Sequence, residues 1–474
     1  MSAAAGQHPA RQPARHPGRL TPDERAARGK AARQAVPREQ QARFDPPASR
    51  PDPVSLLERQ AAGRIGDLVP IRYGRMLASP FAYYRGAALP MAADLAGTPA
   101  SGLTAQLCGD AHLSNFGVYA SPERRLVFDV NDFDETAPGP WEWDVKRLAA
   151  SLEIAARGNG CPGKARRQIT VAAVARYRAA MRDFAQMNDL DTWYAHAELD
   201  ELPAAMLAPF GPAAAAQPGS AHPGDNQREL RKLTHSEQGR PRFNSSPPLL
   251  VPVAELSGTG EENVAQLSDL VSRYRDTLES DRQFLLDRFE MADLARRVVG
   301  VGSVGTRCWV VLMLGRDDDD PLFLQVKEAV PSVLQEFTGP AQYASQGQRV
   351  VAGQRLMQAS SDIFLGWQTD DAGPAGRPRD FYVRQLRDGK QSAEIESLDP
   401  SALRRYGQLC GWTLARAHAR SGDRIAIAAY LGGSDVFDRA VGEFADRYAN
   451  QNERDLTALD AARKAGRIIA HKGI

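Results

Sequence analysis

The sequence contains few cysteines, no long apolar run and almost no net charge. Its four cysteines stand far apart without a Cys-x-x-Cys pair, which argues against a disulfide framework or a zinc site and indicates reduced thiols. No stretch of roughly 18 consecutive apolar residues exists, so we expect no transmembrane helix. The net charge of +1 argues against a surface devoted to nucleic acid or to a membrane.

The beginning of the chain contains Arg and Pro but no apolar core, so it does not predict a secretory signal. Together with the reduced cysteines, this predicts a cytoplasmic protein with neither a nucleic-acid nor a membrane partner. What is present is the composition of a globular enzyme. A length of 474 residues and a hydrophobic share of 43% fit a large core divided into two or three domains or lobes.

The composition changes along the chain and predicts several parts. Residues 1–50 are rich in Arg, Pro, Ala and Gln and predict a disordered basic tail, which we expect to be solvated rather than bound to an acidic partner. Residues 203–228, rich in Ala, Pro and Gly, predict a mobile insertion or linker. The rest is predicted to form a helical large lobe at 51–290, a small β lobe at 291–390, and C-terminal helices at 391–474 that complete the large lobe.

The most informative segment runs from Cys108 to Asp134. Phosphoryl transfer needs one carboxylate to orient an attacking hydroxyl, and an amide plus a second carboxylate to hold magnesium. Asp110, Asn115 and Asp132 have the chemistry and the order for these three tasks. Asp and Asn near Gly often only form turns. A turn, however, does not require this set together with an Asp-Phe-Asp after a strand, so the segment predicts a catalytic loop.

Three further residues of this segment have predicted roles. His112 lacks a second His or Cys at ligand spacing, so we place it with the catalytic loop, where bracing by hydrogen bonds is favoured over metal binding. Asp134 either assists metal binding or orients the loop. Asp144 opens the helix predicted over 144–157 and is placed to cap it and to accept amides of the catalytic loop.

A second motif, Gly-x-Gly-x-x-Gly, spans Gly300–Gly305 between two apolar strands. Glycines let a backbone turn approach phosphate oxygens, and its amides can donate to them. A dinucleotide-binding fold would require a helix after the glycines, but an apolar, β-branched run that predicts a strand, Cys308–Leu314, follows. The motif therefore favours the phosphate-covering loop of a kinase. The predicted nucleotide-binding residues in it are Gly300, Gly302, Ser303 and Gly305.

Lys327 ends the next strand and is the predicted phosphate-binding lysine. In isolation, a solvent-facing strand lysine would be favoured, but its position after the glycine motif reverses that preference. The expected partner of such a lysine is a helix glutamate, for which we predict Glu336 on the following helix. Glu328 points to the opposite face of the strand and is disfavoured.

A segment dense in arginines and aromatics precedes the catalytic loop. Arg72, Arg75 and Arg85 fit either a packed helix with snorkelling arginines or a basic rim for phosphate or an acidic substrate. The residues alone leave both interpretations open.

The catalytic segment resembles the aminoglycoside and choline kinase superfamily. The usual pattern there is His-Gly-Asp-x-His-x-x-Asn, then Asp-Phe-Asp, then an Asp on the following helix; this sequence has Cys108 in place of the first His. From about residue 50 the chain is also similar to an uncharacterised bacterial family known as domain of unknown function 2252, through the runs Ser79–Gly86, Gln106–His112 and Val298–Arg307.

The motif order departs from that of a standard kinase, because the catalytic loop precedes the glycine motif and lysine by about 190 residues. Circular permutation accounts for this order. The resemblance thus implies an α+β, protein-kinase-like two-lobed fold with permuted motif order, in which strand 380–386 and the turn at 387–390 form the adenine-side linker.

The resemblance implies transfer of the γ-phosphoryl group of ATP, with magnesium, to a hydroxyl or amine of a small-molecule acceptor. Two other functions stay open. One is an ATP-binding pseudoenzyme or regulator, and the other is nucleotidyl (AMP) transfer on the same fold.

Overall fold

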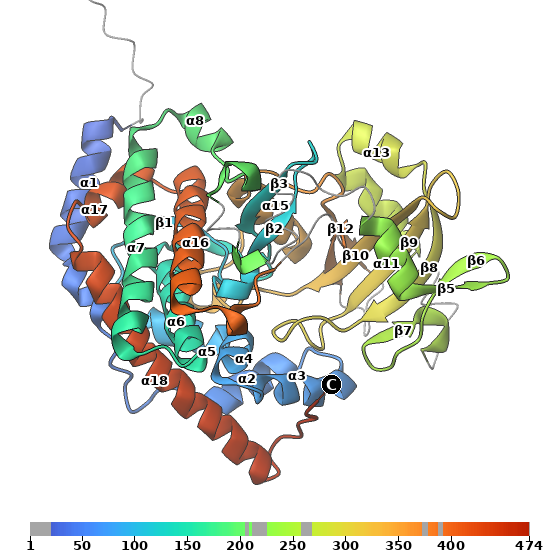
Figure 1. Ribbon diagram of the computed structural model, residues 1–474, viewed down its shortest axis with the longest axis horizontal. Coiled ribbons are helices and arrows are strands. Elements are labelled where there is room, and N and C mark those ends of the chain that lie inside the picture. The colour runs from blue at the N-terminus through green and yellow to red at the C-terminus, as the bar shows by residue number, and fades with distance from the viewer. Residues whose placement is uncertain are drawn as a thin grey trace, which may run out of the picture.

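The protein is a mixed α+β molecule with helices gathered on one side and a large sheet on the other (Figure 1). The computed structural model describes residues 20–203, 208–210, 225–256, 268–371, 378–386 and 392–473. Most of the insertion predicted at 203–228 and the turn predicted at 387–390 lie outside these residues. Among the described helices, none combines the length and apolar character that a membrane span needs.

The large sheet has six antiparallel strands in the order β11-β12-β10-β9-β8-β7. Its central strand β10 is buried along its whole length, so Lys327 enters the protein interior near the end of this strand. The predicted strands at 308–314, 322–327 and 380–386 are confirmed as β9, β10 and β12. The strands are β7 Leu250–Pro252, β8 Glu290–Arg297, β9 Cys308–Leu314, β10 Pro321–Ala329, β11 Gly366–Asp370 and β12 Arg379–Gln385.

The sheet part begins earlier than the predicted boundary at residue 290. Tyr274 and Leu286, the latter on helix α13 Ser280–Leu286, pack against Leu324 in one apolar cluster. Phe243 packs against Phe323 in another cluster. The chain from about residue 225 therefore belongs with the sheet. Its short elements explain the error, because none carries a long enough apolar pattern to reveal its partner. They are α11 Asp225–Leu233, β5 Thr234–Glu237 and β6 Arg240–Phe243.

The helical part has one core built from both halves of the chain. Helix α16 Pro400–Ser421 lies along α7 Gly163–Gln186, and the approach is close because a Cβ at Gly411 would meet the Ala173 carbonyl oxygen at 2.3 Å. The other long helices of this core are α6 Glu142–Gly158 and α18 Val436–Lys464, and the short helices α8 Asp189–Tyr194 and α17 Arg424–Leu431 lie beside them. The C-terminal helices are thus integral to this core.

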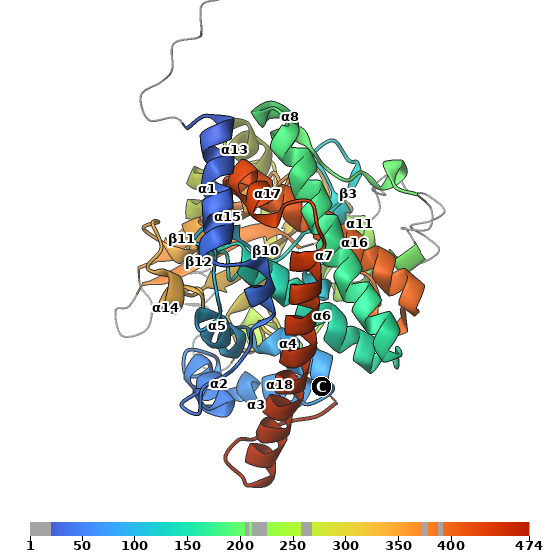
Figure 2. The same cartoon turned by 90° about the vertical axis from the view of Figure 1, so that its left-hand side faces the viewer.

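The predicted disordered tail at 1–50 is wrong from residue 20 onward. Helix α1 Pro22–Ala35 lies against α17 (Figure 2), where Arg25 pairs with Asp423 at 2.8 Å. Gly29 permits the contact, since a Cβ there would lie 2.0 Å from the Ala426 carbonyl oxygen. A polar composition concealed this docking, because it depends on one small residue and ion pairs rather than on a broad apolar face. Residues 1–19 lie outside the described residues.

Four short helices link the helical part to the glycine motif. They are α2 Pro53–Ala61, α3 Val69–Met76, α4 Pro80–Gly86 and α5 Ala88–Ala96. The amide of Ile65, between α2 and α3, donates to the Gly305 carbonyl at 2.8 Å. The C-terminal segment returns to the same group, where the His471 amide donates to the Pro70 carbonyl at 2.8 Å.

Candidate functional site

The predicted catalytic loop connects β1 Thr104–Leu107 to β2 Phe116–Ala120. Gly109 turns the chain there with φ of +82°, and a Cβ at this position would lie 2.1 Å from the Glu135 carbonyl oxygen, so only glycine fits. The carboxylate of Asp144 accepts the amides of Cys108 at 2.8 Å and Gly109 at 3.1 Å. The prediction that Asp144 accepts loop amides is therefore confirmed, whereas its predicted role as the cap of the helix is wrong, because α6 begins at Glu142 and contains Asp144 in its first turn.

His418 supports the same loop from the end of α16. Its Nε2 lies 3.3 Å from Asp144 Oδ2, and its Nδ1 lies 2.9 Å from the hydroxyl of Tyr177. Sequence reasoning did not identify this role, because His418 is about 270 residues from Asp144 and no local pattern joins them. Thus the last turn of α16 orients Asp144, the residue that accepts the amides of the catalytic loop.

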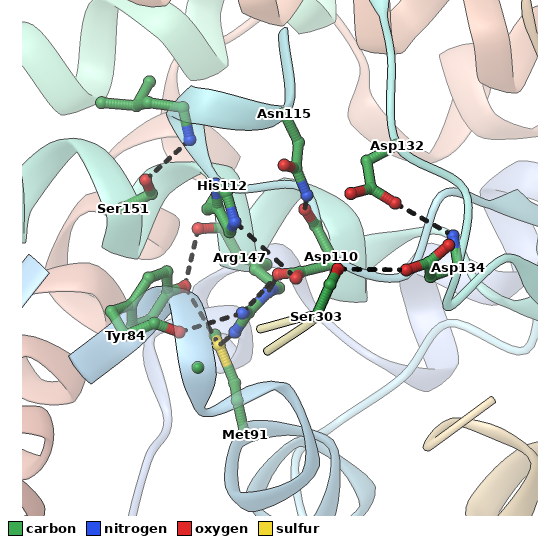
Figure 3. Close-up of polar contacts among 12 residues, drawn as sticks. Tyr84, Met91, Asp110, His112, Asn115, Asp132, Asp134, Arg147, Ser151 and Ser303 are labelled. Carbon is green, nitrogen blue, oxygen red and sulfur yellow. Dashed lines mark hydrogen bonds and ion pairs between the residues drawn. The ribbon is translucent and has the colours of Figure 1, made fainter. Parts of the chain in front are cut away.

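Asp110 is held on two sides (Figure 3). Its Oδ1 accepts Nε of Arg147 at 2.6 Å and Nη2 at 2.5 Å, and its carbonyl accepts Nδ2 of Asn115 at 2.8 Å. His112 Nε2 is 3.7 Å from Asp110 Oδ2, beyond hydrogen-bond distance, and its buried Nδ1 has no partner among the described residues, so the predicted bracing by hydrogen bonds of its side chain is wrong. Asp110 Oδ2 is therefore the carboxylate oxygen that Arg147 does not engage.

Arg147 is a site residue that sequence reasoning missed. Its side chain is 3% exposed and its guanidinium lies 4.5 Å from the ring centroid of Tyr84. Arg147 follows Asp144 by one helical turn on α6, so both side chains reach the catalytic loop from one helix face. That spacing was the available signal.

Asp134 accepts hydrogen bonds from side chains of the sheet. Its Oδ1 accepts the hydroxyl of Tyr382 at 2.7 Å, and its Oδ2 accepts Nζ of Lys327 and, at 3.5 Å, the hydroxyl of Ser303 (Figure 3 shows the Ser303 contact). Lys327 and Tyr382 are directly opposite on β10 and β12, so both point to the same side of the sheet. The adjacent Asp132 accepts the Asp134 amide at 3.2 Å.

The predicted pairing of Lys327 with Glu336 is wrong. Glu336, on α14 Gln335–Thr338, pairs with Arg59 at 2.7 Å, and its side chain is 48% exposed. Glu328 pairs with Arg307 at 3.1 Å. The error arose because the sequence separation between Lys327 and the following helix does not reveal how far apart the two lie in space.

The helix after α14 carries an arginine at the centre of these contacts. Arg349, on α15 Gln346–Met357, donates to the carbonyls of Asp134 at 2.8 Å, Thr136 at 2.6 Å and Val330 at 2.9 Å. It therefore joins two segments: the loop between β3 Leu126–Val130 and β4 Ala137–Pro140, and the end of β10.

The predicted residues meet around one cavity of about 140 Å³. It is lined by Gly300, Gly302 and Ser303 from the glycine loop, by Asp110, His112, Asn115, Asp132 and Asp134 from the catalytic segment, and by Arg72 and Arg85 from the short helices together with Arg64 from the segment between α2 and α3. Lys327 and Gly305 do not line the cavity themselves. Lys327 contacts the lining residue Asp134, and the Gly305 carbonyl accepts the amide of Ile65, which anchors the glycine loop. Glu336 is the one predicted site residue that the structure places elsewhere.

The glycine loop is anchored by the segment that carries these arginines. Arg64 Nη1 donates to the Val304 carbonyl at 2.5 Å, and Arg75 Nη1 donates to the Gly300 carbonyl at 2.6 Å. Gly300 has φ of +66° and a Cβ there would meet nothing within 4 Å, so its backbone is open on that side. Of the three predicted basic residues, Arg72 and Arg85 line the cavity, and Arg75 instead braces the loop.

Burial shifts the protonation of several groups. It raises the pKa of the Asp110 carboxyl although Arg147 acts in the opposite sense, and it raises the pKa of Asp132, aided by the charge of Asp134. Burial would also raise the pKa of Asp134, but Lys327 and Tyr382 hold that pKa below its usual range. Burial, together with Arg85 and Arg147, lowers the pKa of His112 well below its usual value, so the imidazole is neutral at neutral pH.

The donor set fits magnesium better than a metal held by protein alone. In the part of the chain that the structure describes, no group of three or more His, Cys, Asp or Glu could hold a metal ion. Magnesium usually takes one or two carboxylates and completes its shell with water and phosphate oxygens. Because Asn115 Nδ2 is bonded to Asp110, its Oδ1 is the atom it can offer, and the half-buried Asp132 lines the same cavity.

A comparison with protein families matches residues 64–462 to the family described as an uncharacterised protein conserved in bacteria (DUF2252). The match covers most of the chain, so the protein belongs to this family. The comparisons with curated proteins and with solved structures gave no significant match.

Proposed function

We propose that this member of the DUF2252 family is an ATP- and magnesium-dependent phosphotransferase that acts on a small-molecule acceptor. One observation carries the proposal. Lys327, from the central strand of the sheet, is bonded to Asp134 in the loop that also carries Asp132, and this loop shares a cavity with Asp110 and Asn115. The residues proposed to orient the acceptor, to hold magnesium and to bind phosphate thus lie in one site, although 193 residues separate Lys327 from Asp134.

In the proposed reaction, a hydroxyl or amine of the acceptor attacks the γ-phosphorus of ATP. A bond forms between the acceptor atom and phosphorus, the bond from phosphorus to the β–γ bridging oxygen breaks, and ADP leaves with that electron pair. The acceptor's proton passes to Asp110 Oδ2, the oxygen not engaged by Arg147, and then to solvent. Burial raises the pKa of Asp110, which suits a carboxylate that accepts a proton.

Lys327 and the amides of Gly300–Ser303 would contact the phosphates of ATP. Asn115 Oδ1 and Asp132 would hold magnesium, which neutralises charge on the transferring phosphate when bound. Asp134 would orient Lys327 and the loop through its contacts with Tyr382 and Ser303.

We further propose that the fold is kinase-like and two-lobed with circularly permuted connectivity. An antiparallel sheet that carries the glycine loop between β8 and β9 and the lysine on β10 supports this. So does helix α16, whose His418 lies 3.3 Å from Asp144, the residue that accepts the catalytic-loop amides, although 274 residues separate the two. In an unpermuted chain this helix would lead into the loop directly.

Lys327 pairs with Asp134, in the loop after β3, rather than with a helix glutamate. This pairing favours a second candidate function. A regulator that binds ATP without turnover could use this arrangement. The acceptor-orienting Asp110, which a binding module does not need, weighs against it.

The deciding experiment measures ADP release and acceptor mass for the full chain with ATP and magnesium. We expect Asp110→Asn to lower turnover by about 10²–10⁴-fold, the usual contribution of such a group. Asp183→Asn, an exposed aspartate on α7, should leave turnover unchanged. ATP binding without any turnover would identify the regulator, and addition of AMP rather than phosphate to the acceptor would identify nucleotidyl transfer.

A further inference from the structure

One wall of the cavity consists of arginines from the short helices. Arg72 is fully buried, and both of its hydrogen bonds come from Nη2, to Gln60 Oε1 at 2.6 Å and to the Gly86 carbonyl at 2.9 Å. Its Nε and Nη1 are buried and have no partner among the described residues. A buried guanidinium with two unpaired nitrogens is costly, so the fold retains it against a clear physical penalty.

Arg85 and Arg64 repeat this feature in the same wall. Among the described residues the guanidinium of Arg85 makes no hydrogen bond or ion pair, and its Nε is buried. Arg64 uses Nη1 for the Val304 carbonyl, while its buried Nε has no partner in the described chain. Three guanidinium groups therefore present unused donors at one cavity.

The acids of the cavity do not neutralise these arginines. Three acids are already paired, Asp110 with Arg147, Asp134 with Lys327, and Glu328 with Arg307. This leaves Asp132 and Glu135 facing three arginines. Glu135 uses one oxygen for the Val333 amide at 2.7 Å, so two carboxylates remain for three guanidinium groups.

We propose that the arginine wall of Arg64, Arg72 and Arg85 binds a phosphate group on the acceptor, so that the substrate is an anionic hydroxyl compound of the sugar-phosphate class. This rests on the proposed phosphotransfer. Three guanidinium groups that line one cavity match the charge and the several oxygens of a phosphate dianion better than those of a carboxylate, which one Arg can hold. The same wall repels cationic acceptors such as aminoglycosides or choline.

The position of Arg85 places this group on the acceptor side. Arg85 directly follows Tyr84, whose carbonyl accepts Nη2 of Arg147 at 3.2 Å, and Arg147 also donates to Asp110, so Arg85 lies at the catalytic-loop end of the cavity. The phosphates of ATP already have Lys327, magnesium and the glycine-loop amides. The positive charge of the arginine wall is additional to these groups, so it accommodates a further anion, the phosphate group of the acceptor.

The test measures binding of inorganic phosphate to the full chain by calorimetry, after the nucleotide site has been filled with magnesium and a non-hydrolysable ATP analogue. We expect phosphate to bind the wild-type complex, and Arg85→Gln to weaken this binding about tenfold, the loss of one charge-assisted hydrogen bond. The analogue's affinity should stay within about twofold in the same variant. Arg85→Lys should recover part of the phosphate affinity, because it restores the charge.

Controls separate this inference from the proposed function. Arg59→Gln, an exposed arginine whose partner is Glu336, should change neither affinity. If Arg85→Gln weakens the analogue and the filled protein binds no phosphate, the arginines serve ATP and the acceptor inference is wrong. If the wild type does not bind the analogue, the phosphotransferase proposal fails, and phosphate binding to the protein alone, lost in Arg85→Gln, still supports the anion site.

An acceptor screen supplies the second measurement. With ATP and magnesium, we expect phosphorylation of sugar phosphates and none of aminoglycosides or neutral sugars. Equal kcat/KM values for cationic and phosphorylated acceptors would overturn the inference, whereas turnover confined to phosphorylated acceptors supports it.

Discussion

Lys327 donates a hydrogen bond to Asp134 and thereby ties the central strand of the sheet to the loop after β3. Both side chains are largely buried, with the lysine 3% exposed. The pair matters for stability as well as for the proposed chemistry, because a buried charge that loses its partner is strongly destabilising.

Lys327→Met should lower the free energy of unfolding by about 3–5 kcal/mol, because it leaves the Asp134 carboxylate buried without its cation. The double variant Lys327→Met/Asp134→Asn should recover part of this loss. Urea unfolding measures both, and Lys164→Met, an exposed lysine on α7, is the control. If the losses of the two single variants simply add in the double variant, the residues are not coupled.

The same pair has a pH signature. The pKa of Asp134 lies below its usual 3.8 in the folded protein, so its stabilising contribution is present above that value and is lost as the pH falls through the lowered pKa. Acid unfolding of Asp134→Asn should therefore show a weaker dependence on pH below about 4 than the wild type. Identical acid limbs would exclude a stabilising role of the charged carboxylate.

Glu135 should act in the opposite direction. Burial raises its pKa from 4.5 to about 6, so the folded protein holds this proton more tightly and stability falls as the pH rises between those values. The shift corresponds to a loss of about 2 kcal/mol across that window. Glu135→Gln can still accept the Val333 amide and should remove this slope, which unfolding measured at several pH values would show. A slope unchanged in the variant would assign it to other groups.

Asp144→Ala should disorder the catalytic loop. Two buried amides would lose their acceptor, at about 1–3 kcal/mol for each unsatisfied group, and His418 would lose a contact. Asp144→Asn keeps one oxygen acceptor and should be less destabilised. Hydrogen exchange at Cys108 and Gly109 would report the loop directly, and equal exchange in the two variants would contradict this account.

Glu336→Gln should leave ATP affinity unchanged and alter the unfolding free energy by less than about 1 kcal/mol, because an exposed ion pair contributes little. Asp134→Asn, measured beside it, should weaken ATP binding, since Asp134 orients Lys327. A tenfold loss of ATP affinity in Glu336→Gln would restore the glutamate to the nucleotide site.

The sequence was most informative where chemistry and local pattern coincide. Strand Cys308–Leu314 was predicted to the residue because its run is apolar and β-branched, and Gly109 to Asn115 carries its polar residues within one loop. Arg147 and His418 were missed because their contacts with the loop depend on how helices pack. The docking of α1 was missed for a related reason, since its close contact depends on Gly29 and a partner almost 400 residues away.

The two parts of the molecule also differ in how continuous they are along the chain. The sheet part comes from a nearly continuous stretch between about residue 225 and Gln385, whereas the core of the helical part joins residues as distant as Phe44 and Tyr448. Domains generally fold as units as they leave the ribosome. We therefore expect the sheet to acquire its structure first on the ribosome, whereas the catalytic loop and the cavity become ordered only after α16 and α18 have been synthesised.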